Sequence, residues 1–270
     1  MTDAPSPDAD PPAVATDLRL ASAWLARNDL AHARPTPLLA KRLAVREGAR
    51  LVAALITCAL ILATALTAVP VFDGSPPRTL PLLALAALMA ALLLAQSLID
   101  RWVRRVDQRA GATLSRRVAH PIQPGWRAVL GRPYAVHAAA VLAGAILLPV
   151  SALAVADATV RQLAVVLLIG QLGLAVINAM QLLHLLRRPV VAEDESSLIA
   201  DVIMRVDDAR ELASPSVQST LPMVLLFGTA PGWWSAAAVA YLVLTLLVYV
   251  VLRFRTPSSA TVARRIMGVR

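Results

Sequence analysis

Several stretches of this chain are apolar over the length that a helix needs to cross a lipid bilayer. A bilayer core about 30 Å thick takes roughly 20 helical residues, because each residue adds about 1.5 Å. Inside lipid a helix satisfies its own backbone hydrogen bonds, so a long apolar run predicts a spanning helix. The predicted fold class is therefore all-α, a polytopic transmembrane helical bundle. Its full-length spans are predicted at about 51–69, 80–99, 134–155, 162–185 and 233–252.

The composition excludes the soluble classes. Hydrophobic residues make up 58% of the 270 residues and charged residues only 16%. Soluble domains average about 45–50% apolar and about 25% charged residues. A soluble core of this size cannot hide such an excess, so a soluble enzyme and a disordered protein are excluded. Cys58 is the single cysteine, which also excludes a disulfide scaffold.

A shorter apolar segment at 215–229 decides the topology. If this segment spans, the chain crosses six times and both termini lie on one side. That side then holds 24 of the 26 Lys and Arg residues, and only Arg78 and Arg161 lie on the other. Cytoplasmic loops are enriched in Lys and Arg. The sequence therefore predicts six spans with both termini in the cytoplasm.

The net charge is +9, and the basic residues responsible for it stand next to the predicted spans. Basic residues in that position bind anionic lipid head groups, so we expect a lipid bilayer, not nucleic acid, as the partner. Lys41 is the only lysine beside 25 arginines, and Ala, Leu and Val are abundant. That usage indicates a GC-rich bacterial genome and hence a bacterial plasma membrane.

The predicted organisation follows from these spans. Residues 1–16 form an acidic, proline-rich tail expected to be disordered. Residues 17–36 predict an amphipathic helix, which lies either on the membrane surface or against other cytoplasmic segments. The other parts are a membrane domain at 37–254, its cytoplasmic loops at 100–134 and 186–214, and a basic cytoplasmic tail at 255–270.

Helix signals occur at three places outside the spans. Asp17 is a candidate cap for the amphipathic helix, and Thr36 followed by Pro37 predicts the start of the next one. Residues 193–197 predict the start of a further helix that continues through 198–213, in which Asp201 and Arg205 can pair. Its apolar face is predicted to hold Leu198, Val202, Val206 and Ala209.

The charged residues of that further helix are expected on a solvated, salt-bridged face. A docking surface for a cytoplasmic partner is the alternative. The residues concerned are Asp201, Asp207, Asp208, Glu211, Arg205 and Arg210.

The sequence contains little that indicates chemistry. It lacks the zinc-protease, nucleophile-elbow, phosphate-loop and dinucleotide-binding motifs. No ionisable residue lies well inside a predicted span, which argues against proton-coupled transport and intramembrane catalysis. His137 and His184 both fall near the cytoplasmic interface, but too few further ligands accompany them for a metal site. We therefore expect no enzyme activity, no cofactor and no metal.

The fourth predicted span is the most polar one. Gln171, Asn178, Gln181 and His184 either line a substrate path or make hydrogen bonds between helices, and hydrogen bonding is the default for such residues. Gln96 and Ser97, at the end of the second span, are interpreted as interfacial anchors. Candidate close-packing positions are small residues on the third and fourth spans: Ala140, Gly144, Gly170 and Gly173.

Two functions fit these features. The first is a permease-type transport subunit that works with a cytoplasmic ATPase through residues 100–134 and 190–214. Six spans with both ends inside match the general plan of ABC exporter permeases, an analogy of topology alone. The alternative is a non-transporting scaffold, assembly or regulatory protein that binds a partner through the same loops.

Overall fold

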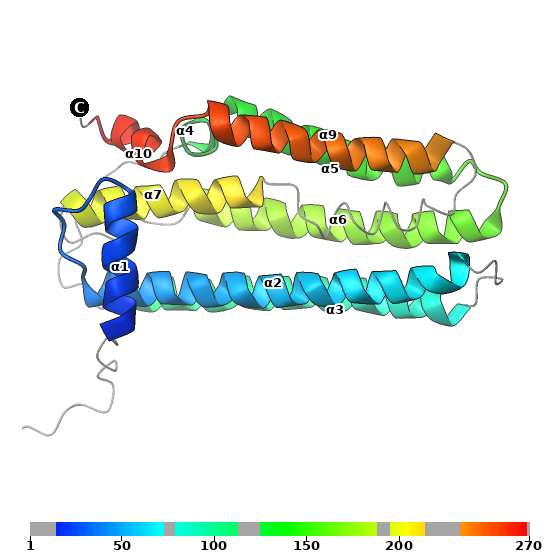
Figure 1. Cartoon of the computed structure of the whole chain (residues 1–270), viewed down its shortest axis with the longest axis horizontal. Helices are drawn as coiled ribbons and strands as arrows, with labels where there is room; N and C mark the ends of the chain where they lie inside the picture. Colours follow the sequence, from blue (N-terminus) through cyan, green and yellow to red (C-terminus); the bar gives the residue numbers. More distant parts are fainter. Residues whose placement is uncertain (1–14, 73–78, 113–124, 188–194, 214–232, 269–270) are drawn as a thin grey trace, which may run out of the picture.

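The structure is a computed structural model that describes residues 15–72, 79–112, 125–187, 195–213 and 233–268. Every regular element in these ranges is a helix. The long helices run side by side, whereas α1 crosses their end (Figure 1). The helices are α1 (Ala15–Arg27), α2 (Pro37–Phe72), α3 (Thr79–Ala112), α4 (Trp126–Val129), α5 (Gly131–Ala152), α6 (Ala158–Arg187), α7 (Glu195–Leu212), α9 (Trp233–Arg255) and α10 (Ser259–Met267).

The long helices pack in the order α2, α3, α6, α5 and α9, each against the next. Between α5, α6 and α9 the buried contacts are made largely by small side chains such as Ala145, Ala164 and Ala238. Small residues let helices approach closely, which matters in lipid because no hydrophobic effect drives helices together there. The bundle is therefore held by close backbone packing along the length of its helices.

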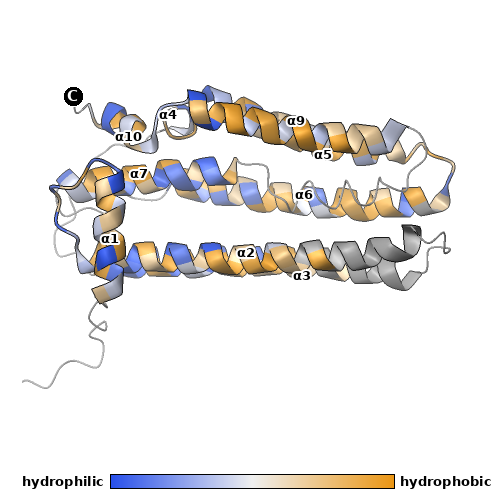
Figure 2. Ribbon diagram, in the orientation of Figure 1, coloured by the Kyte–Doolittle hydropathy of each residue, from blue (hydrophilic) through white to orange (hydrophobic). Residues whose placement is uncertain are grey.

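Three helices among the described residues are long and apolar enough to cross a membrane: α5, Val160–Arg187 of α6, and α9. Large apolar side chains on them point outward, including Leu147 and Leu244, both nearly two thirds exposed. Figure 2 shows the apolar colour along these helices. Water would strongly disfavour such exposed apolar surface, whereas lipid would cover it. The all-α class is confirmed, and these helices indicate a membrane protein.

The predicted spans map onto the helices as follows. Those at 134–155, 162–185 and 233–252 correspond to α5, α6 and α9 within a few residues. Those at 51–69 and 80–99 lie within α2 and α3, and 215–229 lies outside the described residues. Beyond its predicted span, α3 continues to Ala112, so the loop expected at 100–134 begins as a helix.

The helix starts are partly as predicted. The Thr36 hydroxyl accepts a hydrogen bond from the Leu39 amide at 3.2 Å, so Thr36 caps α2 as expected. Asp17 is not the cap of α1, because that helix already begins at Ala15. Asp17 lies in the first turn instead, where a carboxylate favours the positive end of the helix dipole.

Four segments assemble at one end of the bundle into a helical cap, formed by α1, the first turns of α2, α7 and α10. Their apolar faces share one core, in which Ala21, Ala40, Ile203 and Ala263 are completely buried. The apolar face of α1 therefore packs against protein, which selects the second of the two alternatives for this helix.

Candidate functional site

Arginines on one face of α2 connect the cap to the bundle. Arg42, Arg46 and Arg50 recur every four residues, so they share a face. Arg42 is 3% exposed and donates from Nε to Asp107 on α3 at 2.9 Å. Its Nη2 donates to Asp201 on α7 at 2.5 Å. One guanidinium thus joins three helices that are far apart in the sequence.

The next turn of α2 repeats this arrangement. Arg46 Nη2 lies 3.1 Å from both Asp107 Oδ2 and Asp208 Oδ2. Burial alone would lower the pKa of Arg46, but the carboxylates of Asp208 and Asp107 outweigh it and raise this pKa above its ordinary value. Arg50, half exposed, reaches Glu211 of α7 at 3.5 Å. The pairs therefore run from the core of the cap to its surface.

The environment expected for α7 is wrong for two of its charged residues, Asp201 and Arg205. Its apolar face is buried as predicted, and Arg205 Nη2 pairs with Asp201 Oδ2 at 3.3 Å. Two members of its charged face are not solvated, however, because Asp201 is 0% and Arg205 1% exposed, whereas Glu211 is exposed as expected. Helices α6 and α10 pack against α7. Arginines of α2, and not water, therefore compensate the charges of Asp201 and Asp208.

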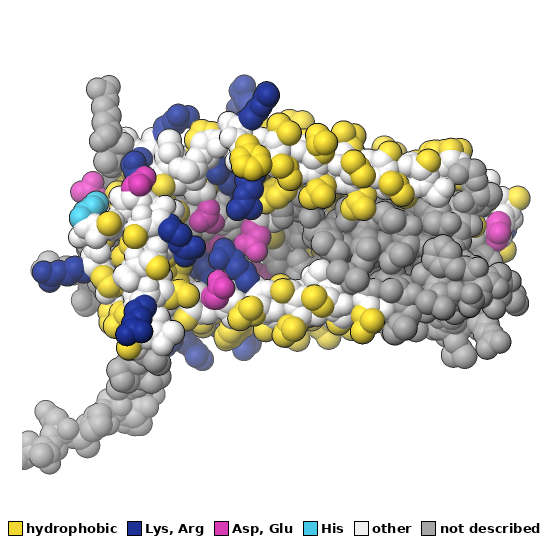
Figure 3. All heavy atoms as spheres, in the orientation of Figure 1, with side chains coloured by type: hydrophobic (Ala, Val, Ile, Leu, Met, Phe, Trp, Pro, Cys, Tyr) yellow, Lys and Arg dark blue, Asp and Glu magenta, His cyan; other side chains and the backbone are white. Residues whose placement is uncertain are grey.

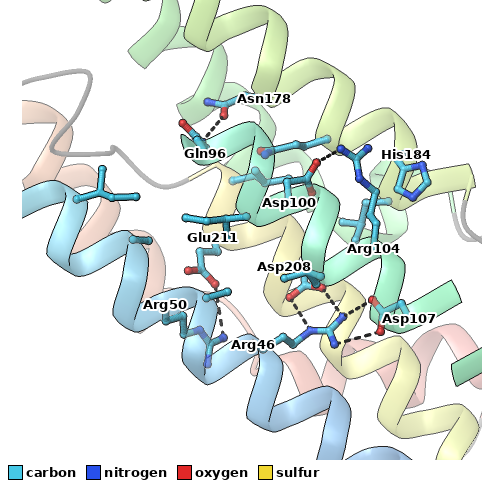
Figure 4. A pocket seen from close by; sticks show the side chains of 18 of the residues that line it. Arg46, Arg50, Gln96, Asp100, Arg104, Asp107, Asn178, His184, Asp208 and Glu211 are labelled. Atoms are coloured by element: carbon cyan, nitrogen blue, oxygen red, sulfur yellow. Dashed lines mark hydrogen bonds and ion pairs between the residues drawn. The ribbon is translucent and has the colours of Figure 1, made fainter. Parts of the chain in front are cut away.

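A cavity of about 390 Å³ opens beside these ion pairs, between α2, α3, α6 and α7. In Figure 4 the labelled side chains of these four helices surround one space. Its described lining contains charged, amide and apolar side chains. They are Arg46, Ala49, Arg50, Ala53, Ile56, Thr57, Gln96, Ile99, Asp100, Val103, Arg104, Asp107, Asn178, Gln181, His184, Leu185, Asp208, Glu211 and Leu212. We call it the charged cavity.

Helix α3 presents polar residues to the charged cavity at helical spacing. These residues are Gln96, Asp100 and Arg104, which follow one another at intervals of four residues. Asp100 forms an ion pair with Arg104. Burial raises the pKa of Asp100, in opposition to Arg104 and His184, which lower it. Asp100 is therefore a partly buried carboxylate that Arg104 holds in an ion pair at the wall of the cavity.

The candidate path residues of α6 are divided between two cavities. Asn178, Gln181 and His184 all line the charged cavity. Gln171, 2% exposed, lines a second cavity of about 230 Å³ between α5, α6 and α7, and Asn178 borders both. Asn178 Oδ1 also accepts a hydrogen bond from Gln96 Nε2 at 3.5 Å. These side chains thus make an interhelical hydrogen bond and line a cavity at once.

The small residues differ in how closely other helices approach them. A Cβ on Gly144 would lie 2.5 Å from Tyr241 Cε2 of α9, and one on Gly173 would lie 2.8 Å from Leu93 Cδ1 of α3. Gly170 is buried, whereas Ala140 is exposed beside a groove between α5 and α9. Two of the glycines therefore stand at tight helix crossings.

His137 and His184 line different spaces. His137, 5% exposed, lies on the groove between α5 and α9 near Tyr249, and His184 lies in the charged cavity. Among the described residues no group of three His, Cys, Asp or Glu side chains could hold a metal ion.

Sequence reasoning missed the contributions of α2 and α3. Gln96, interpreted as an interfacial anchor, lines the charged cavity, and Asp107 bridges two arginines of α2. The four-residue spacing of Arg42, Arg46 and Arg50 was a usable signal, but it identifies a polar face without identifying its partner. Comparison of the chain with family models, curated proteins and solved structures found no match.

Proposed function

We propose that this chain is a permease-type transport subunit of a bacterial plasma membrane that works with a cytoplasmic ATPase. The observation that carries the proposal is the charged cavity, which lies where the apolar helices meet the helical cap. A polar space at that level is suited to admit a solute from the cytoplasm. No catalytic step is part of the proposal.

Described residues on either side of the predicted fifth span, 215–229, support six spans. Ala213 packs in the core around Val129 and Tyr134, at the start of α5. The Trp234 indole donates a hydrogen bond to Ser151, at the far end of α5, at 3.1 Å. The chain therefore changes ends of the bundle between Ala213 and Trp234, as a fifth span at 215–229 requires.

The placement of both ends of the chain supports an even number of crossings. Arg264 of α10 pairs with Asp29, just after α1, at 2.7 Å. Basic side chains gather at this end of the molecule (Figure 3). By the enrichment of Lys and Arg in cytoplasmic segments, the cap faces the cytoplasm and its exposed arginines meet anionic head groups.

The ATPase is expected to contact the segment around α4. Residues 190–214, the other expected contact, offer less surface in their described part because the middle of α7, from Leu198 to Val206, is buried. Trp126 of α4 is 44% exposed, and the Arg127 guanidinium lies over its ring at 5.2 Å. Exposed tryptophan and arginine are the residue types that contribute most to protein interfaces.

A scaffold or regulatory protein is the second candidate. The observation in its favour is the network of buried ion pairs, which fastens the cap to α2 and α3. A rigid cap can hold a partner in place without any change of conformation.

Purification of the tagged full-length chain from its own host in mild detergent tests the proposal. We expect an ATPase to copurify in stoichiometric amount with vanadate-sensitive ATP hydrolysis. Trp126→Ala should reduce its recovery severalfold, whereas Trp233→Ala, exposed at the start of α9 and at the opposite end of the bundle, should not. Recovery of the intact chain with a partner that does not bind ATP would favour the scaffold.

A further inference from the structure

Two buried acceptor atoms in the charged cavity have no hydrogen-bond partner among the described residues. They are Gln96 Oε1 on α3 and Gln181 Oε1 on α6. The amide nitrogen of Gln96 is engaged by Asn178 at 3.5 Å, and Gln181 forms a hydrogen bond with Asp100. Buried amide oxygens nearly always accept a hydrogen bond in native proteins. Two such oxygens without a partner in one cavity therefore indicate a ligand that donates hydrogen bonds.

The charges of the lining point to the same kind of ligand. Among the described residues around the cavity, four carboxylates face three guanidinium groups and the titratable His184. The guanidinium groups are engaged: Arg46 by Asp107 and Asp208, Arg50 by Glu211, and Arg104 by Asp100. Each carboxylate oxygen can accept a further hydrogen bond. Asp107 also pairs with Arg42, so the unused capacity of the cavity is for hydrogen-bond donors, which its carboxylate and amide oxygens can accept.

The shape of the cavity adds an apolar requirement. Ala53 and Ile56 of α2 and Val103 of α3 line it beside the polar groups. Its volume of about 390 Å³ falls within the range of small-molecule sites, roughly 300–1,000 Å³. A ligand that fills it therefore carries a compact polar head and a short apolar body.

We propose that the charged cavity binds an organic monocation that carries N–H donors and a short apolar body, namely a primary alkylammonium. The ammonium donates to Gln96 Oε1 and Gln181 Oε1, and Asp100 and Glu211 supply the counter-charge. This inference rests on the proposed function, since it names the class of solute that the transport subunit would take.

Other ligand classes fit the lining less well. An anion would meet four carboxylates and arginines that already pair with them. A quaternary ammonium is recognised by aromatic faces, but no Phe, Tyr or Trp is among the described lining residues. A primary ammonium alone uses both the charge and the open acceptors.

Isothermal titration of the full-length chain in lipid nanodiscs tests this inference. The probe is hexylammonium, and the comparison probes are hexyltrimethylammonium, hexanol and hexanoate, with empty nanodiscs as the blank. We expect saturable binding of hexylammonium at least about tenfold tighter than that of any comparison probe, because each hydrogen bond to a charged group contributes about that factor. Equal binding of the quaternary ion, or no heat above the blank, overturns the assignment.

Variants locate the site. Gln96→Met and Gln181→Met keep the side-chain length but remove the acceptor, and each should weaken hexylammonium binding about tenfold. Ser97→Ala, the neighbour of Gln96 whose hydroxyl bonds Leu94 of its own helix, is the matched control and should bind like the wild type. Wild-type affinity in both methionine variants overturns the assignment. If a variant does not fold, the wild-type probe series still decides.

The binding measurement is independent of any ATPase. Hexylammonium binding without a copurifying ATPase would retain the site and refute the transport partner. An ATPase without hexylammonium binding would do the opposite.

Discussion

Asp201 shows how much single buried charges determine in this protein. Its carboxylate has no solvent contact and joins Arg42 of α2 to Arg205 of its own helix. Buried charges are tolerated only with partners in good geometry, because each costs several kcal/mol to dehydrate. The cap is thus fixed to the bundle by ion pairs, and removal of one partner would destabilise the protein.

Asp201→Ala should therefore destabilise the protein strongly. The variant leaves two buried arginines short of a carboxylate, which typically costs about 3–5 kcal/mol. We expect the thermal midpoint in detergent to fall by at least about 6 °C for a chain of this size. Glu195→Ala, exposed in the first turn of the same helix, removes only an interaction with the helix dipole and should lower it far less. Equal midpoints for both variants would show that the pairs do not stabilise the cap.

Asp207 makes stability depend on pH. Burial raises its pKa above 3.8, helped by Asp208 and opposed by the hydrogen bond from Ser259. Its contribution to stability is thus fully present below the unfolded pKa and is lost as pH rises through the folded pKa. Asp207→Asn should be at least as stable as the wild type at pH 7, and this advantage should vanish near pH 4.

Thermal unfolding between pH 4 and 8 measures this difference, with Asp157→Asn, exposed between α5 and α6, as the control. A deficit of the Asp207→Asn variant that grows as pH rises would mean that the charged form stabilises the fold.

At the scale of elements, the bundle relies on close approach between helices. Gly144 of α5 lies under the ring of Tyr241 of α9, whose hydroxyl donates to the Val141 carbonyl at 2.7 Å. The glycine thus makes room for an aromatic side chain that also satisfies a backbone group of the neighbouring helix. Packing and hydrogen bonding are coupled at this crossing.

Gly144→Ala should weaken this crossing. Its Cβ would lie 2.5 Å from the tyrosine ring, and overpacking of this kind costs about 1–3 kcal/mol. Gly48→Ala, in the middle of α2, meets Trp102 only at 3.4 Å and should be neutral or stabilising, since alanine favours helix. Thermal unfolding in nanodiscs compares the two variants. A stable Gly144→Ala protein would show that α9 can shift away from α5.

At the scale of the whole molecule, the cap brings both ends of the chain together. The pair between Arg264 and Asp29 and the packing of α10 against α7 require that the chain return to the side on which it started. This arrangement is the one that the proposed six crossings require.

Reporter fusions test this topology. Reporters before Met1 and after Arg270 should both give a cytoplasmic signal, and one inserted at Asp157 should give an external signal. An external signal from the C-terminal fusion would rule out six spans.

Most of the helices could be predicted because their signals are local. Apolar length marked α5, α6 and α9, and the Thr36–Pro37 pair marked the start of α2. The candidate site was only partly predicted. The polar face of α6 was visible in the sequence, but Gln96 and Asp107 belong to other helices and carry no local signal of the cavity.

The sequence by itself determined that the chain is helical and suited to lipid, since helix length and hydropathy depend on neighbouring residues alone. Only the tertiary structure decided where the charges go. Asp201 and Arg205 have the spacing of a solvated helix face, yet they are buried because α2, α6 and α10 cover that helix. The energy of a charge depends on the groups around it in space, and the arginine that pairs with Asp201 from α2 lies 159 residues away in the sequence.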